Sequence, residues 1–139
     1  MINVFAFIIY MNIPEISGAL TFFYYNNLEE AYKFYMDIMG FEIKLDIDWV
    51  KIFKIGNDCH LGIVNSEMGS HKPSENKPVR LQIMVSDAQA WLNYFREIGV
   101  PTMNDELYVG SLLNIKTCTV KDPGDYAIEI CEYTTPYGV

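Results

Sequence analysis

Few side chains in this sequence combine a reactive group with a position in an apolar segment. Glu129 and Cys131 lie two residues apart within the apolar stretch Tyr126–Tyr133, and the only histidines are His60 and His71. A carboxylate with apolar neighbours is a candidate general base because burial raises its pKa, and carboxylates and imidazoles also bind divalent cations. A cysteine without a histidine or cationic partner is usually inert. Glu129 is therefore the candidate catalytic residue.

The composition limits what such a site could act on. The chain has 139 residues, of which 50% are hydrophobic and 14% aromatic, enough to build the core of one domain. It carries 18 acidic and 10 basic side chains, a formal charge of -8, which disfavours nucleic acids and anionic membrane surfaces as partners. Three cysteines without C-x-x-C spacing indicate no disulfide framework and favour the cytoplasm. Small molecules or other proteins remain as partners.

Residues 1–18 are expected to form an N-terminal tail. Its first part, Met1–Met11, is apolar, but it has no basic start and no cleavage site of small residues. About ten apolar residues are also too few to span a bilayer, which takes about 20. Two interpretations remain open: the segment is an extra edge strand or a tail packed on a neighbour, or translation begins at Met11.

The elements that would position these side chains follow a regular order in the first half of the chain. Asn27 and Glu30 form a predicted capping box, from which a helical stripe of apolar residues runs to Gly40. Strands are expected on both sides of this helix because short apolar or alternating runs are bounded by turn residues. They are Leu20–Tyr25, Phe41–Asp48, Val50–Ile55 and Cys59–Val64.

The second half repeats this order after a polar linker at 66–79. Ser86 and Gln89 suggest a second capping box, which opens a helix that ends at Gly99. A shift of 60 residues places Asn27 on Asp87, which indicates a duplicated βαβββ unit. We therefore predict an α+β fold, one domain of residues 1–139, with modules at 19–65 and 80–139 whose curved mixed sheets enclose a cavity. The strands expected in the second module are Arg80–Val85, Val100–Met103, Leu112–Val120 and Tyr126–Tyr133.

Side chains alternate between the two faces of a strand, which separates the core from a possible ligand wall. In the second module, Leu81, Ile83 and Val85 are expected under the helix, and their neighbours are expected on the opposite face. That face mixes aromatic and polar groups, as small-molecule pockets do. The faces of the strands near Val50 and Leu112 stay open. The candidate ligand-binding residues are Phe22, Tyr24, His60, Arg80, Gln82, Met84, Glu129 and Tyr133.

Two motifs carry a resemblance to a known family. Phe34-Tyr35-x-x-Ile38-x-Gly40-Phe41 and Asp122-Pro-Gly-Asp-Tyr-Ala-Ile-Glu129 are similar to stretches of the vicinal oxygen chelate superfamily, which includes glyoxalases, bleomycin-resistance proteins and extradiol dioxygenases. The resemblance covers roughly 20–133. It implies paired βαβββ modules around a cavity, often in homodimers. In the metal-dependent members it also implies a divalent ion that chelates vicinal oxygens of the substrate.

The positions that correspond to the family's metal ligands are poorly suited to a metal here. They fall on Leu20, Gly62, Arg80 and Glu129, of which only the last can bind a cation. We expect no metal cofactor, and we expect Arg80 and Glu129 to form an ion pair in place of the ion. The alternative is a divalent metal ion at a displaced site of His60, Glu129 and His71. Otherwise His60 is a hydrogen-bonded wall residue and His71 a solvated loop residue.

These considerations leave three functional hypotheses. The first is a metal-free protein of the bleomycin-resistance type that binds an aromatic or cationic small molecule in the cleft of a homodimer. The second is a metal-dependent lyase, isomerase or dioxygenase with a rearranged site. The third is an accessory domain with a vestigial pocket. The identity of the ligand, the presence of any reaction, and whether the modules close within one chain or swap with a second chain all stay open.

Overall fold

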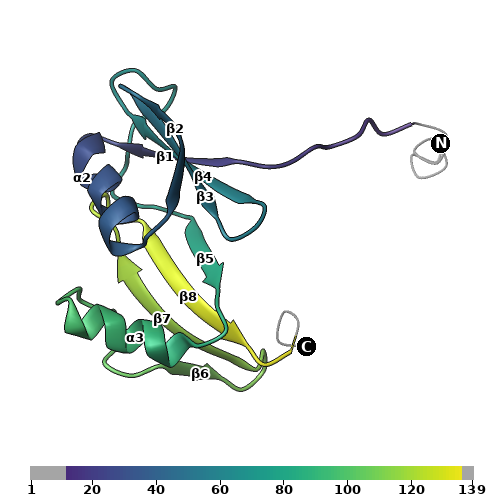
Figure 1. Cartoon of the computed structure of the whole chain (residues 1–139), viewed down its shortest axis with the longest axis vertical. Coiled ribbons are helices and arrows are strands. Elements are labelled where there is room, and N and C mark those ends of the chain that lie inside the picture. The colour runs from purple at the N-terminus through teal and green to yellow at the C-terminus, as the bar shows by residue number, and fades with distance from the viewer. Residues whose placement is uncertain (1–11, 136–139) are drawn as a thin grey trace.

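The computed structural model describes residues 12–135, which form two four-stranded sheets, each with a helix on one side (Figure 1). The first module contains α2 and the short π-helix η1 between its first two strands. Its elements are β1 (Thr21–Tyr25), α2 (Leu28–Lys33), η1 (Phe34–Ile38), β2 (Glu42–Ile47), β3 (Val50–Ile55) and β4 (Cys59–Asn65).

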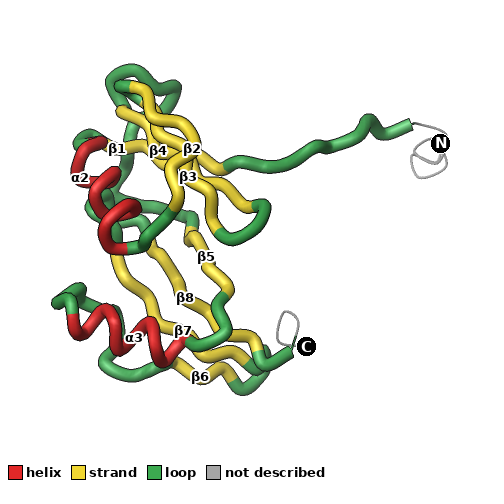
Figure 2. Tube along the Cα trace, in the orientation of Figure 1, coloured by secondary structure: helices red, strands yellow, loops and turns green. Residues whose placement is uncertain are grey.

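The second module repeats this arrangement with α3 as its helix. Its elements are β5 (Arg80–Met84), α3 (Ala88–Glu97), β6 (Tyr108–Gly110), β7 (Ile115–Lys121) and β8 (Ala127–Tyr133). The strand orders are β1-β4-β3-β2 and β5-β8-β7-β6, so each module pairs its first strand in parallel with its last. The predicted α+β fold of two βαβββ modules is confirmed, and the two sheets are visible as the yellow strands of Figure 2.

The predicted division of the strands between two faces is also found. The odd-numbered residues Leu81, Ile83 and Val85 pack against the core, as do Ile128 and Ile130 of β8. Helices α2 and α3 cover this face of their sheets, on the left in Figure 1. The opposite faces, called here the concave faces, carry the candidate ligand-binding residues.

A β-bulge interrupts the predicted alternation in β2. Ile43 pairs with Phe53 and packs against the core, whereas Leu45 pairs with Ile52 because the register shifts between Ile43 and Leu45. The shift turns Leu45 onto the concave face. The strict alternation expected over Phe41–Asp48 is therefore wrong beyond Ile43, since a bulge adds one residue and reverses the face of the residues after it.

The second module departs from the expected elements at four points, the first of which is β6 (Tyr108–Gly110), a strand that was not expected. Val100–Met103 is not a strand and makes only the isolated bridge Thr102–Val120, because Pro101 has no amide hydrogen to donate. Leu112 lies in the turn between β6 and β7, and β7 begins at Ile115. The cap of α3 is Asp87, whose side chain accepts from the Ala90 amide, and not Ser86.

The turn after β7 joins the two modules. Asp122 is 4% exposed, and one carboxylate oxygen accepts hydrogen bonds from the hydroxyls of Tyr25 and Tyr35 in the first module. The other oxygen accepts from the amides of Gly124 and Tyr126, each at 2.9 Å. Burial raises the pKa of the Asp122 carboxyl, and these hydrogen bonds oppose the rise. We call these five residues the Asp122 cluster.

The described chain begins with an extended segment. Residues 12–20 are exposed and lead away from the modules, as Figure 1 shows. Both interpretations of Met1–Met11 concern residues that lie outside the described ones. Within residues 12–135, no helix is both long and apolar enough to cross a membrane.

Candidate functional site

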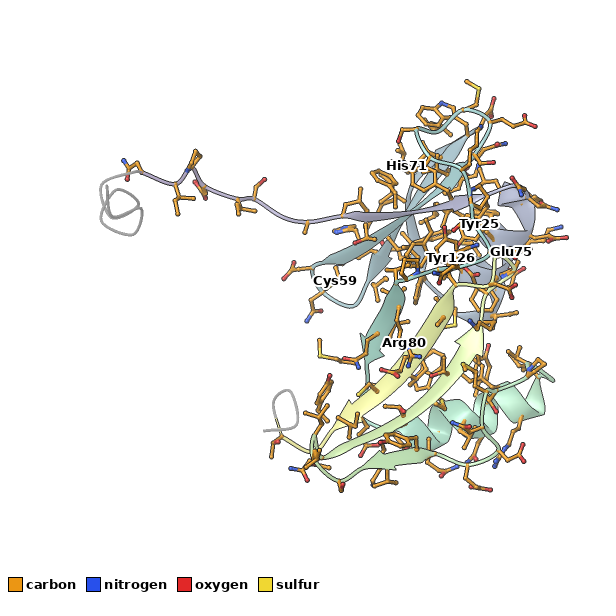
Figure 3. All side chains as sticks on the ribbon, turned by 180° about the vertical axis from the view of Figure 1, so that it is seen from behind. Tyr25, Cys59, His71, Glu75, Arg80 and Tyr126 are labelled. Atoms are coloured by element: carbon orange, nitrogen blue, oxygen red, sulfur yellow. The ribbon has the colours of Figure 1, made fainter. Side chains whose placement is uncertain are left out.

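The polar centre of the second module is Glu129, on the concave face of β8. It is 9% exposed, and its two carboxylate oxygens accept from different side chains of the parallel strand β5. Arg80 Nη1 contacts Oε2, and Gln82 Nε2 donates to Oε1 at 2.7 Å. The expected ion pair between Arg80 and Glu129 is therefore present. Figure 3 shows Arg80 on this side of the second module.

The hydrogen-bonded row continues to the end of β8. The hydroxyl of Tyr133 donates to Oε1 of Gln82 at 2.5 Å, so the amide is held from one side and donates to Glu129 on the other. Cys131 lies between Glu129 and Tyr133 on the same face and is fully buried. Burial raises the pKa of its thiol, which keeps the thiol protonated and agrees with its expected inertness.

Residues of β6 and β7 complete a small cavity of about 190 Å³ around this ion pair. Thr117 and Thr119 are buried and face it from β7, where Thr119 lies directly opposite Glu129. Tyr108 of β6 forms part of its rim. The cavity thus offers one charge pair, two threonine hydroxyls and a tyrosine ring with its own hydroxyl, which suits hydrogen bonding to a small polar group.

The first module has a larger and more apolar cavity on its concave face. Its volume is about 460 Å³, and its wall includes the predicted residues Phe22 and Tyr24. Trp49, at the turn between β2 and β3, also lines it, as does Leu45 after the bulge. We call this hollow the module 1 cavity. Its full lining consists of Phe22, Tyr24, Leu45, Trp49, Val50, Ile52, Val64, Met68, Gly69 and Ser70.

The remaining predicted residues lie apart from Glu129. The ring of His71 meets the ring of Tyr24 edge-on, with the ring centroids 5.1 Å apart. His60, on β4, lies opposite Lys54 of β3. Met84 is 59% exposed. Among residues 12–135, no three His, Cys, Asp or Glu side chains gather in a group that could hold a metal ion. The structure therefore does not bring His60, His71 and Glu129 together.

The donor set at the family's ligand positions does not fit a divalent cation. A side chain at Gly62 would overlap the ring of Phe22, which lies directly over this glycine. Leu20 offers no donor atom, and Arg80 brings a positive charge to the one remaining carboxylate. A cation here would face a single ligand that is already neutralised by Arg80, so these residues do not fit a divalent metal ion.

Two parts of the site are missing from the sequence-based prediction. Leu45 and Trp49 depend on the bulge in β2 and on the turn after it, neither of which has a clear sequence signal. Thr117 and Thr119 were not identified because the residues near Leu112 did not indicate which face of the strand points to the core. The alternation of these threonines with Cys118 and Val120 was the signal available, since both of the latter pack in the core.

Comparisons with known proteins agree with this architecture. Residues 18–130 match the model of the Glyoxalase/Bleomycin resistance protein/Dioxygenase superfamily, and the chain belongs to this family. No curated protein matches the sequence.

Solved structures share the fold. A lactoylglutathione lyase from Agrobacterium tumefaciens is 19% identical, with a TM-score of 0.65 over 86% of this chain and 96% of that one. A glyoxalase/bleomycin resistance protein/dioxygenase from Nocardioides is 11% identical, with a TM-score of 0.73 over 93% and 91%. A protein of the same description from Alicyclobacillus acidocaldarius is 18% identical, with a TM-score of 0.65 over 86% and 92%.

Proposed function

We propose that this chain is a metal-free small-molecule-binding protein of the glyoxalase/bleomycin-resistance superfamily. The observation that carries the proposal is the Arg80–Glu129 ion pair, which occupies two of the family's ligand positions at once. Phe22 fills the space over a third position, Gly62. What remains is a pair of cavities with apolar, aromatic and hydrogen-bonding walls, which is the usual construction of a small-molecule site.

Binding rather than catalysis agrees with the state of Glu129. One lone pair on each carboxylate oxygen is engaged by a protein side chain, which leaves less of the carboxylate available to act as a base toward a substrate. The arrangement instead holds the carboxylate in place and leaves the half-exposed side chain of Arg80 beside the cavity. We assign Arg80, Gln82 and Glu129 a role in positioning a ligand's polar group.

We further propose that the protein acts as a cytoplasmic homodimer. Large apolar side chains are exposed on β6 and in the β6–β7 turn, namely Val109, Leu112 and Leu113. Exposed apolar surface of this extent favours association. Light scattering should then give about twice the chain mass of 16.0 kDa, and a mass near 16.0 kDa would contradict the dimer. The cytoplasm suits the three cysteines, all unpaired.

Two measurements test the binding proposal. Protein purified without chelators should carry no stoichiometric Zn, Ni, Mn or Fe, and a retained equivalent of any of them would contradict it in favour of metal chemistry. Thermal-shift screening against a small-molecule library should find compounds that raise the melting temperature, because a ligand of the folded state stabilises it. Arg80→Ala should weaken such shifts, whereas Lys44→Ala, which breaks an exposed ion pair with Glu42, should not. A library without hits would favour the accessory-domain hypothesis.

A further inference from the structure

We propose, on the basis of the binding function above, that the module 1 cavity takes an uncharged aromatic group and rejects ions. The rings of Phe22 and Trp49 line it, and they are 42% and 40% exposed, so both offer open ring surface to a ligand. Aromatic rings stack with one another and bury a large apolar area at low cost in conformational entropy. Besides these rings, the absence of charged side chains from the cavity lining determines which chemical class of ligand fits.

None of the described residues that line the module 1 cavity carries a formal charge. Its two hydroxyl-bearing side chains, Tyr24 and Ser70, hydrogen-bond to each other at 3.2 Å, and the ring of His71 rests edge-on against Tyr24. Lys51, between the lining residues Val50 and Ile52 on β3, contacts Asp46 and lies over the ring of Tyr32 of α2. An ion that entered the cavity would therefore lose water and gain no counter-charge, which is costly.

The size of the module 1 cavity suits an aromatic group of moderate size. Its volume of about 460 Å³ falls in the range usual for small-molecule sites, about 300–1,000 Å³. One wall is formed by a tight backbone approach at Gly69, where an added Cβ would come within 2.7 Å of Val64 and 2.9 Å of Tyr24. The ring of Phe22 lies close enough to Gly62 to leave no room for a side chain between them. A planar two-ring molecule meets apolar surface on all these sides.

The cavities of the two modules differ in the charge of their walls, so we expect them to bind different ligands. Around Glu129 the wall is charged and hydrogen-bonding, whereas around Phe22 it is apolar. A charged ligand is therefore expected to depend on Arg80 and an uncharged aromatic group on Trp49. Charged ligands can therefore still bind beside Arg80 when no aromatic group binds in the module 1 cavity, so the inference can fail while the proposed function stands.

The sequence provides an internal reporter because it has only two tryptophans, Trp49 in the module 1 cavity and Trp91 on α3. The probe is 6-propionyl-2-dimethylaminonaphthalene, an uncharged naphthalene that accepts excitation energy from nearby tryptophan. In the Trp91→Phe variant its binding should quench the remaining tryptophan emission, and in the Trp49→Phe variant it should leave that emission nearly unchanged. Energy transfer that survives in Trp49→Phe and is lost in Trp91→Phe would overturn the assignment.

Competition with three matched naphthalenes tests the charge preference. 2-Naphthylmethanol, which is uncharged, should displace the probe at a concentration about ten-fold lower than 2-naphthoate or 2-naphthylmethylammonium, a difference of about 1.4 kcal/mol. Ser70→Asp places a carboxylate at the rim and should reverse the order in favour of the ammonium compound. Ser74→Asp, on the exposed linker outside the cavity lining, serves as its matched control and should leave the order unchanged.

Three outcomes would overturn the inference. One is equal or tighter binding of either ion to the unmodified protein. Another is a dimer that buries Trp49, seen as a concentration-dependent blue shift of its emission together with loss of probe binding. The third is a failure of the uncharged naphthalenes to bind while library compounds bind in a way that needs Arg80, a result that would keep the proposed function. A complete lack of binding by the naphthalenes and the library would remove both.

Discussion

In the Arg80–Glu129 pair, the residue at one of the family's ligand positions determines what the residue at another position can do. A lone buried carboxylate would be a base or a metal ligand, but with a guanidinium and an amide on its two oxygens it becomes a fixed part of the wall. The pair could be predicted from sequence because two strands of period two place both residues on one face. Its partner Gln82 was expected on that face but not as the donor to Oε1.

The Arg80→Ala variant tests how much Glu129 depends on its ion pair with Arg80. Arg80→Ala leaves one oxygen of the nearly buried Glu129 without its donor, so we expect a loss of about 1–3 kcal/mol in the free energy of unfolding. Glu129→Gln in the same background should recover part of the loss, since a neutral amide is easier to bury. Chemical denaturation of the single and double variants checks this. An additive cycle would show that the two side chains do not interact in solution.

Phe22 and Gly62 form a second dependent pair. Gly62→Ala should destabilise the protein because the new methyl group overlaps the Phe22 ring, and Phe22→Ala should relieve much of that cost. Gly18→Ala is the matched control, since nothing lies within 4 Å of its added Cβ. Thermal unfolding of the four variants tests the pair. A Gly62→Ala variant as stable as Gly18→Ala would contradict the observed ring position.

At the scale of elements, the features that sequence could not predict are those that break a period. The bulge in β2 moves Leu45 to the other face, and η1 continues α2 as a π-helix in which the Met39 amide bonds to Phe34 at 3.0 Å. Both are local insertions into an otherwise regular pattern, and tertiary packing selects where they occur. The regular strands β5 and β8 contain no such insertion, which is why their faces were predicted correctly.

The turn between β7 and β8 gives a pH-dependent prediction. Burial raises the pKa of Asp122 above its unfolded value near 3.8, so over the interval between these pKa values the folded state binds more protons than the unfolded one. The contribution of Asp122 to stability is therefore fully present below pH 3.8 and declines as pH rises through the raised pKa. The unfolding free energy of the wild type minus that of Asp122→Asn should fall over this interval and stay constant above it.

Two features of the Asp122→Asn variant sharpen this test. It should lose about 1–3 kcal/mol at neutral pH, because an amide nitrogen cannot accept the bonds donated by Tyr25 and Tyr35. The exposed Asp125→Asn serves as the control for the pH series. Unfolding curves that run parallel for wild type and Asp122→Asn at all pH values would contradict a raised pKa.

Across the whole molecule, the two modules meet through few polar contacts among the described residues. Besides the Asp122 cluster, the hydroxyl of Tyr94 on α3 donates to the carbonyl of Ile38 at the end of η1 at 2.7 Å, and Tyr126 both stacks on Phe23 and bonds to the backbone of Tyr24. The duplication and the order of elements could be predicted from sequence periodicity. The contacts between the two modules, called here the seam, could not be predicted, because they join residues far apart in the chain, such as Tyr25 and Asp122.

Loss of the Tyr94 contact should act on the seam alone. Tyr94→Phe removes one hydrogen bond between the modules, and we expect a loss of about 0.5–1.5 kcal/mol in stability. Binding of the naphthalene probe in the module 1 cavity should be unchanged, since Tyr94 lies on the helix side. Tyr108→Phe, an exposed tyrosine of β6, is the control. Equal stability of Tyr94→Phe and wild type would show that the seam does not rely on this bond.

The ring of Phe22 over Gly62 also constrains the order in which this sequence could change toward a metal-binding relative. A histidine or glutamate introduced at Gly62 first would collide with the ring, so that step requires Phe22 to leave its position. A smaller residue at Phe22 must come earlier, and Arg80 must be replaced before a cation gains a free carboxylate. The present site is thus separated from metal dependence by an ordered series of substitutions, and single changes at Gly62 or Arg80 are expected to cost stability.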